Sequence, residues 1–392
     1  MRIALFTDTY EPEVNGVART LKRWVSYLEN RGVACKVFAP SAEPDDRTAQ
    51  GPHSVTRFAS LPFFMYPECR LALPNPLFVK KAIQSFKPTL IHVATPFNIG
   101  LCGLYAAKKF NLPLIASYHT NFDRYLPFYN LQWMEKLLWR YLEWFHHDCS
   151  RILVPTRPVK EELVARGWDE KRLSIWRRGI DPSRYHPRVQ REAWLQRHGL
   201  DPDTFVVLYA GRMAPEKQVD VAIKAFSLFQ RRCPSRTALV LAGDGPTAST
   251  MKELAEQEGI AAYFAGLVQP DDMQRWYAAA DLFLFPSSTE TFGNVVLESM
   301  ACGTPVLCAD QGGVTDIVVH GHTGLMCEAG SDESFADALE LAYRDLPLRR
   351  RLAAAGLNYS RRQTWEAIFD QLFESCIELS GSEYSSSGHI AN

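Results

Sequence analysis

The sequence lacks the marks of a secreted disulfide protein and of a nucleic-acid-binding protein. Its nine cysteines are scattered from Cys35 to Cys376, and no two of them form a C-x-x-C pair. A disulfide framework has an even number of cysteines at regular spacings, so we expect reduced thiols and a cytoplasmic location. The 43 Lys and Arg residues nearly balance the 44 Asp and Glu residues. Because no overall positive charge attracts phosphates, we expect no nucleic-acid partner.

Long uninterrupted apolar runs are also absent. The first apolar run, Ile3–Phe6, is too short for the core of a signal peptide. The longest stretch without Lys, Arg, Asp or Glu runs from 88 to 107, but it contains Pro96, Gly100 and Gly103. These residues interrupt an apolar helix, so the stretch predicts a strand, a turn and a helix start rather than a membrane span.

Short apolar segments instead alternate with amphipathic segments, in two series along the chain. This alternation is typical of a parallel sheet with helices on both faces. In the first series we expect a helix over Gly16–Asn30 and strands over Ile3–Phe6, Cys35–Ala39, Leu90–Val93, Leu114–Ser117 and Ile152–Val154. In the second series we expect strands over Phe205–Tyr209, Ala238–Ala242, Tyr263–Phe264, Leu282–Phe285 and Pro305–Cys308. The helices of that series are expected over Val219–Arg232, Ala248–Gln257, Asp271–Ala280, Val295–Ala301 and Glu333–Arg344.

A segment rich in glycine, proline and charge, at about 177–203, separates the two series and indicates a linker. We therefore expect an α/β protein of two Rossmann-like domains. A ligand of such sheets binds outside the carboxyl ends of the strands, which predicts a ligand in the cleft between two facing domains. The expected parts are an N-terminal domain (1–180), a linker region (181–204), a C-terminal domain (205–363), a last helix (364–380) and a disordered Ser-rich tail (381–392).

Two loops of the second domain carry charged side chains suited to a nucleotide diphosphate. Arg212 and Lys217 follow the first expected strand, where two cations can grip a diphosphate. Glu290 follows the fourth strand, and Glu298 comes about one turn into the next helix, whose free N–H groups attract an anion. Such carboxylates can accept hydrogen bonds from sugar and ribose hydroxyls. A surface ion pair would equally explain the first loop, and a capping Glu290 with an exposed Glu298 would explain the second.

The first domain offers two further candidates. His119 lies at the carboxyl end of the strand Leu114–Ser117, where a histidine can donate to a hydroxyl or brace a sugar. Gly16 lies where the first strand leads into the first helix, so the backbone can approach a ligand closely there. A structural histidine and an ordinary turn would also account for these two positions.

Three further patterns do not indicate a site. Gly243–Ala248 matches G-x-G-x-x-A, but residues 265–270 lack the acidic residue that a nicotinamide dinucleotide site needs. Asp201 and Asp203 form a D-x-D pattern ahead of a strand, which is typical of a turn. His146 and His147 are adjacent and so cannot share one helix face as two metal ligands do. The sequence therefore predicts no metal site.

Taken together, the motifs resemble the retaining GT-B glycosyltransferases of family 4. They occur in the family's order and spacing over nearly the whole chain: Asn15–Val17, Gly211-Arg212 with Glu216-Lys217, the E-x7-E pair Glu290 and Glu298, and Gly312-Gly313. The resemblance implies a GT-B fold in which the C-terminal helix crosses back onto the first domain. One departure is Thr315-Asp316, which stands where the family commonly has Pro-Glu.

The resemblance also implies a role for each site residue. Arg212 and Lys217 would hold the donor diphosphate, Glu290 the hydroxyls of the donor sugar and Glu298 the ribose. Together with His119 near the donor sugar, the first three would form the catalytic set. The remaining donor contacts would come from Gly16 at the phosphate or acceptor, Val268 at the base, and the backbone around Phe292, Gly293, Asn294 and Val295.

The implied reaction is a front-face displacement that uses no protein nucleophile, no metal and no cofactor beyond the nucleotide-sugar co-substrate. Residues 178–181, Arg-Gly-Ile-Asp, resemble the glycolipid mannosyl- and sulfoquinovosyltransferase subset. We therefore expect GDP-mannose as the donor and a lipid or small-glycan hydroxyl as the acceptor. Gln269-Pro270 follows Val268, with no acidic residue at these two positions to bind guanine, so a UDP-hexose remains open. A sugar-nucleotide 2-epimerase of the same shape and a non-catalytic nucleotide-sugar binder are the competing functions.

An aromatic stripe in the first domain raises the question of membrane contact. Two interpretations fit it: a surface that docks peripherally on the inner face of the membrane, with Arg124, Lys136 and Arg140 nearby, or a helix face packed on its own sheet. The run Leu61–Tyr66 has no helical period and predicts an exposed loop on the acceptor side. The stripe itself consists of Trp133, Met134, Leu137, Leu138, Tyr141, Trp144 and Phe145.

Overall fold

A computed structural model describes residues 1–13, 15–41, 54–62, 70–119, 126–233, 236–260 and 262–381 of the chain. Three expectations fall wholly or mainly outside these residues: the tail after Gly381, the run from Leu61 to Tyr66 beyond its first two residues, and the place of Arg124.

The first half of the chain forms a parallel sheet of seven strands in the order β3-β2-β1-β6-β7-β8-β9. Strand β1 pairs with β2 on one side and with β6 on the other, so the strand order reverses beside β1. A reversal of this kind opens a crevice at the carboxyl ends of the strands. The strands are β1 (Arg2–Phe6), β2 (Ala34–Pro40), β3 (Val55–Phe58), β6 (Leu90–Val93), β7 (Leu114–Ser117), β8 (Arg151–Val154) and β9 (Leu173–Ile175).

Helix α1 (Gly16–Asn30) shows how local sequence sets an element of this domain. Asn15 caps it, because its side-chain oxygen accepts a hydrogen bond from Ala18 N at 2.9 Å. Its buried face, which includes Leu21 and Trp24, packs on the sheet. The other elements of this half are α2 (Pro76–Phe86), α3 (Asn98–Phe110), α5 (Glu135–His146), α6 (Arg157–Ala165) and the hairpin of β4 (Ser60–Pro62) with β5 (Arg70–Ala72).

The second half forms a six-stranded parallel sheet in the order β12-β11-β10-β13-β14-β15. Here the order reverses at β10, which pairs with both β11 and β13, so the loops that follow β10 and β13 become neighbours. The strands are β10 (Phe205–Ala210), β11 (Thr237–Ala242), β12 (Ala262–Gly266), β13 (Leu282–Phe285), β14 (Val306–Ala309) and β15 (Gly324–Cys327). The helices are α7 (Arg191–Arg197), α8 (Val219–Arg232), α9 (Ala248–Gln257), α10 (Pro270–Ala279), α11 (Asn294–Ala301), α12 (Asp332–Arg344) and α13 (Leu346–Ser360).

The chain passes between the two halves twice, and the two crossings lie side by side. Ile180 N donates to Gln363 O at 2.6 Å, which ties the outgoing strand to the returning one. At Gly179 an added Cβ would lie 2.5 Å from the backbone nitrogen of Trp365, so only glycine fits at this crossing. The two crossing segments are therefore closely packed against each other between the domains.

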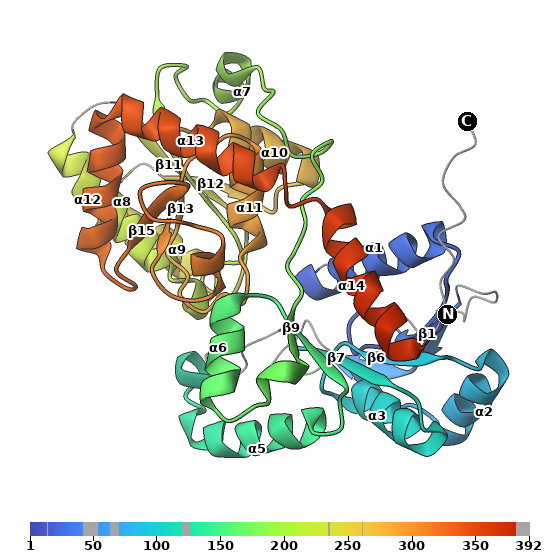
Figure 1. Ribbon diagram of the computed structural model, residues 1–392. Helices are drawn as coiled ribbons and strands as arrows, with labels where there is room; N and C mark the ends of the chain where they lie inside the picture. Colours follow the sequence, from blue (N-terminus) through green and yellow to red (C-terminus); the bar gives the residue numbers. More distant parts are fainter. Residues whose placement is uncertain are drawn as a thin grey trace, which may run out of the picture.

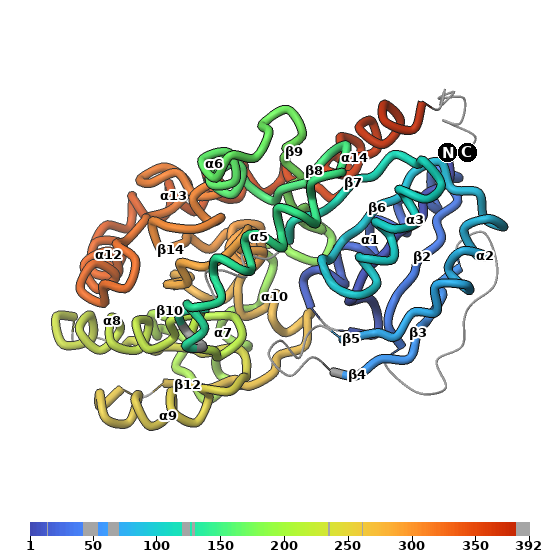
Figure 2. Tube along the Cα trace, turned by 90° about the horizontal axis from the view of Figure 1, so that it is seen from below, coloured from blue at the N-terminus to red at the C-terminus, as the bar shows by residue number. Residues whose placement is uncertain are grey.

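After the second crossing, α14 (Trp365–Ser380) lies against α1 of the first domain (Figure 1). The Phe369 ring lies 5.3 Å from the Trp24 ring, and Tyr27 donates a hydrogen bond to Asp370. The expected architecture is thereby confirmed: two parallel α/β domains and a C-terminal helix that returns to the first. Figure 2 shows the two bodies from below, with α14 beside the N-terminal sheet.

The comparison with the expected elements shows where local pattern was insufficient. Helices α1, α8 and α9 have the predicted bounds. Strands β3, β9 and β15, the β4–β5 hairpin and helix α13 were not predicted, and Leu61 and Pro62, expected in a loop, lie in β4. Helix α7 lies within the segment interpreted as a linker. That segment is attached to the second domain by Arg191, whose guanidinium donates hydrogen bonds to Asp281 at 2.9 Å and to the backbone oxygens of Ala279, Pro202 and Thr204.

Among the described helices, none is long and apolar enough to cross a membrane.

Candidate functional site

The loops after β10 and β13 meet in an ion pair. Lys217 ends a short turn, η4 (Pro215–Lys217), and its Nζ lies 2.5 Å from Oε1 of Glu290. Both side chains are mostly buried, with exposed fractions of 16% and 18%. Two further bonds, from Ser287 and Thr289 to the backbone oxygen of Glu216, hold the loops together. Two motifs 73 residues apart in sequence therefore share one site.

Arg212 lies in the same loop after β10. Two glycines of the G-x-G-x-x-A pattern, Gly243 and Gly245, pack closely against this loop. The carbonyl of Arg212 accepts a bond from the Tyr209 hydroxyl at 3.1 Å. An added Cβ at Gly243 would lie 1.9 Å from Gly211 O, and one at Gly245 would lie 2.3 Å from Met213 O. These glycines therefore let the β11 loop pack against the loop that carries Arg212, which is a structural role.

Glu298 lies on α11 and accepts hydrogen bonds from two tyrosines. Tyr277 donates to its Oε2 at 3.1 Å, and Tyr185, from the segment between the domains, also donates to it. Burial raises the pKa of Glu298, while these hydroxyls and the arginines Arg19 and Arg23 act in the opposite direction. The interpretation of Glu298 as an exposed surface charge is therefore wrong, and the carboxylate is held in place by its two donors.

Two helix N-termini face each other across the cleft between the domains. Helix α11 begins at Asn294, after Gly293 in a left-handed conformation and with no side-chain cap, and α1 begins at Gly16. A Cβ added at Gly16 would lie 3.5 Å from Nδ2 of Asn294. Backbone N–H groups and the helix dipoles favour an anion between these two helix ends.

Replacement of Gly16 by Ala separates a ligand role from a folding role. The φ angle of Gly16 is not in the left-handed region, and the methyl group of alanine would make only ordinary van der Waals contact with Asn294. The fold should therefore be unaffected. We expect an unchanged Tm but a KM for the nucleotide sugar that is at least about ten-fold higher, because the methyl group occupies the space of the anion. Calorimetry and steady-state kinetics test this, and an unchanged KM would contradict a phosphate position at Gly16.

His119 is buried and lies two residues after the end of β7, in the first domain. Its Nδ1 is 2.7 Å from Nη2 of Arg178, and its backbone oxygen accepts a bond from the Thr291 hydroxyl at 2.9 Å. Burial, followed by the nearby positive charge of Arg178, holds the pKa of His119 well below its ordinary value. The histidine of the first domain thus touches the loop that carries Glu290 in the second.

Two more contacts cross the cleft beside this histidine. Thr156 donates to the backbone oxygen of Thr291 at 3.1 Å. Arg177 forms a two-pronged ion pair with Asp316, with distances of 3.0 and 3.3 Å. Asp316 is the residue that departs from the family's Pro-Glu pattern, so its carboxylate serves here to bind the domains to each other.

Four of the predicted donor contacts line one cavity of the protein, whereas the proposed catalytic residues Arg212, Lys217, Glu290 and His119 do not line it. A cavity of about 870 Å³ between the domains is lined by Gly16, Asn294, Val295 and Glu298. Arg19 and Arg23 also line it, and they share one face of α1 with Gly16 because the three positions are spaced i, i+3 and i+7. Sequence reasoning missed these two arginines, although that spacing was visible.

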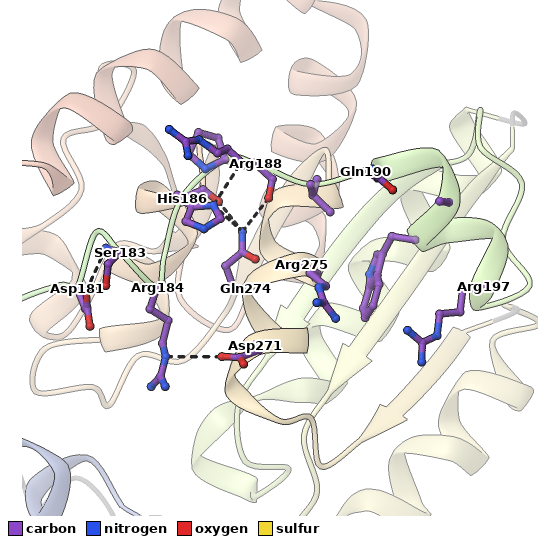
Figure 3. A pocket seen from close by; sticks show the side chains of 14 residues that line it. Asp181, Ser183, Arg184, His186, Arg188, Gln190, Arg197, Asp271, Gln274 and Arg275 are labelled. Atoms are coloured by element: carbon purple, nitrogen blue, oxygen red, sulfur yellow. Dashed lines mark hydrogen bonds and ion pairs between the residues drawn. The ribbon is translucent and has the colours of Figure 1, made fainter.

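A larger, more open cavity of about 1120 Å³ lies between α7, α10 and the segment before α7 (Figure 3). None of the predicted site residues lines it. Within its lining, Gln274 donates a hydrogen bond to His186 O at 2.6 Å, and the Arg184 guanidinium lies 3.8 Å from the Asp271 carboxylate. It shares Asp181 and Arg184 with the cavity between the domains but none of the predicted donor contacts, so volume alone does not identify the site.

The remaining predicted residues have supporting positions. The Phe292 side chain is buried, so only its backbone is available to a ligand. Val268 lies between β12 and α10, partly buried against the core of the second domain. The Gly312-Gly313 loop supports Glu290, because Gly313 N donates to Glu290 O at 2.6 Å. In the described part of the chain, no three His, Cys, Asp or Glu side chains gather to hold a metal ion.

Sequence comparison identifies both halves of the molecule. Residues 14–184 match the family model described as Glycosyltransferase Family 4, and residues 190–359 match the one described as Glycosyl transferases group 1. The two matches together span most of the chain. This protein is a family 4 glycosyltransferase.

The relatives of this glycosyltransferase are named for the transfer of different sugars. It is 29% identical to a GDP-mannose-dependent alpha-mannosyltransferase of Mycobacterium tuberculosis, over 95% of each chain. It is also 29% identical to sulfoquinovosyl transferase SQD2 of Arabidopsis thaliana, over 93% of this chain and 71% of that one. Sucrose-phosphate synthase of Thermosynechococcus elongatus shares the fold, with a TM-score of 0.81 at 21% identity over 97% and 99% of the two chains. The predicted family and GT-B fold are confirmed.

Some residues of the glycosyltransferase site became visible only in the structure. Tyr185 and Tyr277 carried no motif, since a hydroxyl that positions Glu298 has no signature of its own. Arg178 was visible only as a departure from the commoner family pattern. Its contact with His119, 59 positions away, depends on the two strands β7 and β9 ending at the same edge of the sheet.

Proposed function

We propose that this glycosyltransferase moves a mannosyl group from GDP-mannose to a hydroxyl of a lipid or small glycan, with retention of the anomeric configuration and without a metal. The observation that carries the proposal is the meeting of the two motifs, with Lys217 and Glu290 2.5 Å apart in a family 4 chain. The facing starts of α1 and α11 add a place for the donor phosphates.

In the proposed reaction the bond between the sugar C1 and the diphosphate oxygen breaks while the acceptor oxygen bonds to C1 on the same face. The departing diphosphate gains negative charge. Lys217, Arg212 and the helix ends stabilise that charge because they are already in position before the reaction. The acceptor proton passes to an oxygen of the leaving phosphate, so no protein base is needed.

The choice of mannose rests on the mycobacterial relative, which matches over 95% of both chains. The plant relative favours a different sugar, and the two residues directly after Val268, Gln269 and Pro270, carry no carboxylate to bind guanine. A UDP-hexose is therefore the alternative donor in the same site.

Slow hydrolysis of the donor in the absence of an acceptor tests the proposal. GDP-mannose, UDP-glucose and UDP-N-acetylglucosamine should be offered singly, with the Lys217→Met enzyme, purified in the same way, as the control for contaminating hydrolases. Release of mannose from GDP-mannose alone, as the α anomer in proton NMR, is the expected result. Hydrolysis of a UDP-sugar alone would overturn the choice of donor, and interconversion of donor sugars would indicate an epimerase.

We also propose that the acceptor is reached at a membrane surface through the α5 region. The predicted stripe is divided: Phe145 is buried in the core of the first domain, while Trp133, Leu137 and Trp144 are 75%, 62% and 61% exposed. Lys136 and Arg140 on the same helix are exposed as well. Exposed indole rings flanked by cations suit an interface with anionic lipid.

The double variant Trp133→Ser/Trp144→Ser should bind vesicles containing anionic lipid at least about ten-fold more weakly, because each indole contributes buried apolar area at the interface. Co-sedimentation with the vesicles measures this. Donor hydrolysis should be unchanged, since neither tryptophan lines the cavity between the domains. Leu341→Ser, at a 48% exposed position of α12 in the other domain, is the matched control. Equal vesicle binding by the wild type and the double variant would contradict the proposal.

A further inference from the structure

The contact between Arg178 and His119 restricts the chemistry of the histidine. Nη2 of Arg178 lies 2.7 Å from Nδ1 of His119. A guanidinium group has only N–H donors and no acceptor, so Nδ1 must be the acceptor of this bond. An imidazole that accepts at Nδ1 has its single proton on Nε2.

From this geometry we propose that Arg178 is a positioning residue that holds His119 as the neutral Nε2–H tautomer, so that His119 meets the donor sugar only as a hydrogen-bond donor. This inference rests on the proposed function, because it assigns the sugar oxygen as the acceptor of that bond. It also removes His119 from the groups that can take the acceptor proton.

Arg178 is itself held rigidly. It is buried, its Nη1 donates to the backbone oxygen of Trp176 at 3.1 Å, and its guanidinium lies 5.0 Å over the Trp176 ring. The next residue, Gly179, is pressed against the returning strand at Trp365. The guanidinium is therefore placed by the crossing between the domains and does not need a ligand to position it.

The unused nitrogen of His119 indicates an acceptor from outside the protein. Among the described residues, Nε2 of His119 is buried and has no hydrogen-bond partner. Buried polar atoms are almost always paired, and an unpaired one indicates an occupant of the site. The backbone oxygen of the same residue is bonded to Thr291, next to Glu290, so the free N–H belongs to the wall of the proposed sugar site.

Protonation of His119 is opposed by its surroundings. A second positive charge would lie against Arg178, whose pKa burial lowers to about 10, so that it stays charged at neutral pH. The other titratable group acting on the ring is His92, which is buried, bonded to Ser117 Oγ at 2.7 Å, and whose pKa burial lowers to about 3. The ring therefore stays neutral across the working range of the enzyme.

Nitrogen-15 NMR of the histidine-labelled wild-type enzyme tests the tautomer without any turnover. The His119→Gln spectrum assigns the signal by its absence. We expect a proton on Nε2, a bare Nδ1 and no titration between pH 5 and 8. A proton on Nδ1, or titration near the ordinary pKa of about 6.5, would overturn the inference. Because no substrate is present, this outcome is independent of whether the proposed donor is correct.

Two variants then test whether Arg178 is the cause. Arg178→Lys keeps a group that only donates, so it should preserve the tautomer and most of the activity. Arg178→Met removes the donor, so both tautomers should appear, the ring should titrate, and kcat should fall at least about ten-fold with an acid limb absent from the wild type. A folded Arg178→Met enzyme with the wild-type tautomer and pH profile would show that Arg178 is merely structural. If Arg178→Met does not fold, the tautomer of His119 in the wild-type spectrum and in the Arg178→Lys spectrum still tests the proposal.

Discussion

Lys217→Met is expected to lower kcat for sugar transfer by about 10²–10³-fold, the size found when one fixed group that stabilises developing charge is removed. The reason is that Lys217 is already in place, mostly buried and paired with Glu290, before the diphosphate departs. The measurement is kcat and KM with the donor that the hydrolysis screen identifies. A loss confined to KM would mean that Lys217 binds the ground state and the transition state equally.

A matched control and a double variant separate this effect from damage to the fold. Lys224→Met makes the same change on α8, where the ammonium group is 43% exposed and pairs with Asp220, and it should leave kcat unchanged. Lys217→Met leaves the carboxylate of Glu290 mostly buried without its cation, which lowers stability. Lys217→Met/Glu290→Gln should therefore recover Tm while activity stays lost. Recovery of activity along with Tm would assign Lys217 a purely structural role.

Glu298→Gln should have the second large effect, a rise in KM for the donor of about 10²-fold with a smaller change in kcat. A carboxylate can accept bonds from both ribose hydroxyls, each charge-assisted bond contributing about 1.5–3 kcal/mol, whereas the amide of glutamine keeps one acceptor oxygen. Tyr277 and Tyr185 hold the group in the wild type, so its orientation should survive the substitution. Glu253→Gln on the exposed face of α9 is the control.

The pH dependence of KM adds a second readout for Glu298. Burial raises its pKa, so protonation begins at a higher pH than for an ordinary carboxylate. As the pH falls through this raised pKa, the group loses its charge and KM for the donor should rise. The Gln variant should lack this rise, because it has no proton to gain. An identical acid limb in both enzymes would show that another group controls donor binding.

The fold was predictable where one segment carried its own signal. Helix α1 has a capping Asn15 and one buried face, and the buried strand β13 is a continuous apolar run, so their bounds could be read locally. Strand β9 has only three residues, partly exposed, and α13 has a sparse apolar face with a run of arginines. Both depend on neighbours from distant parts of the chain, because such short or weakly amphipathic segments have little stability of their own.

The chemistry of the site divides in the same way. The residue types and spacings of Arg212, Lys217, Glu290 and Glu298 indicated a nucleotide-sugar transferase through their resemblance to family 4, since these motifs lie within short stretches of the sequence. The contacts that set their states join residues far apart in sequence: Lys217 with Glu290, Tyr277 with Glu298, and Arg178 with His119. The first and third contacts arise because parallel strands end at a common edge and bring the residues after them together, and the second joins the packed helices α10 and α11. No local pattern encodes either arrangement. Sequence thus established which groups the enzyme has, and tertiary structure decided their charges, tautomers and partners.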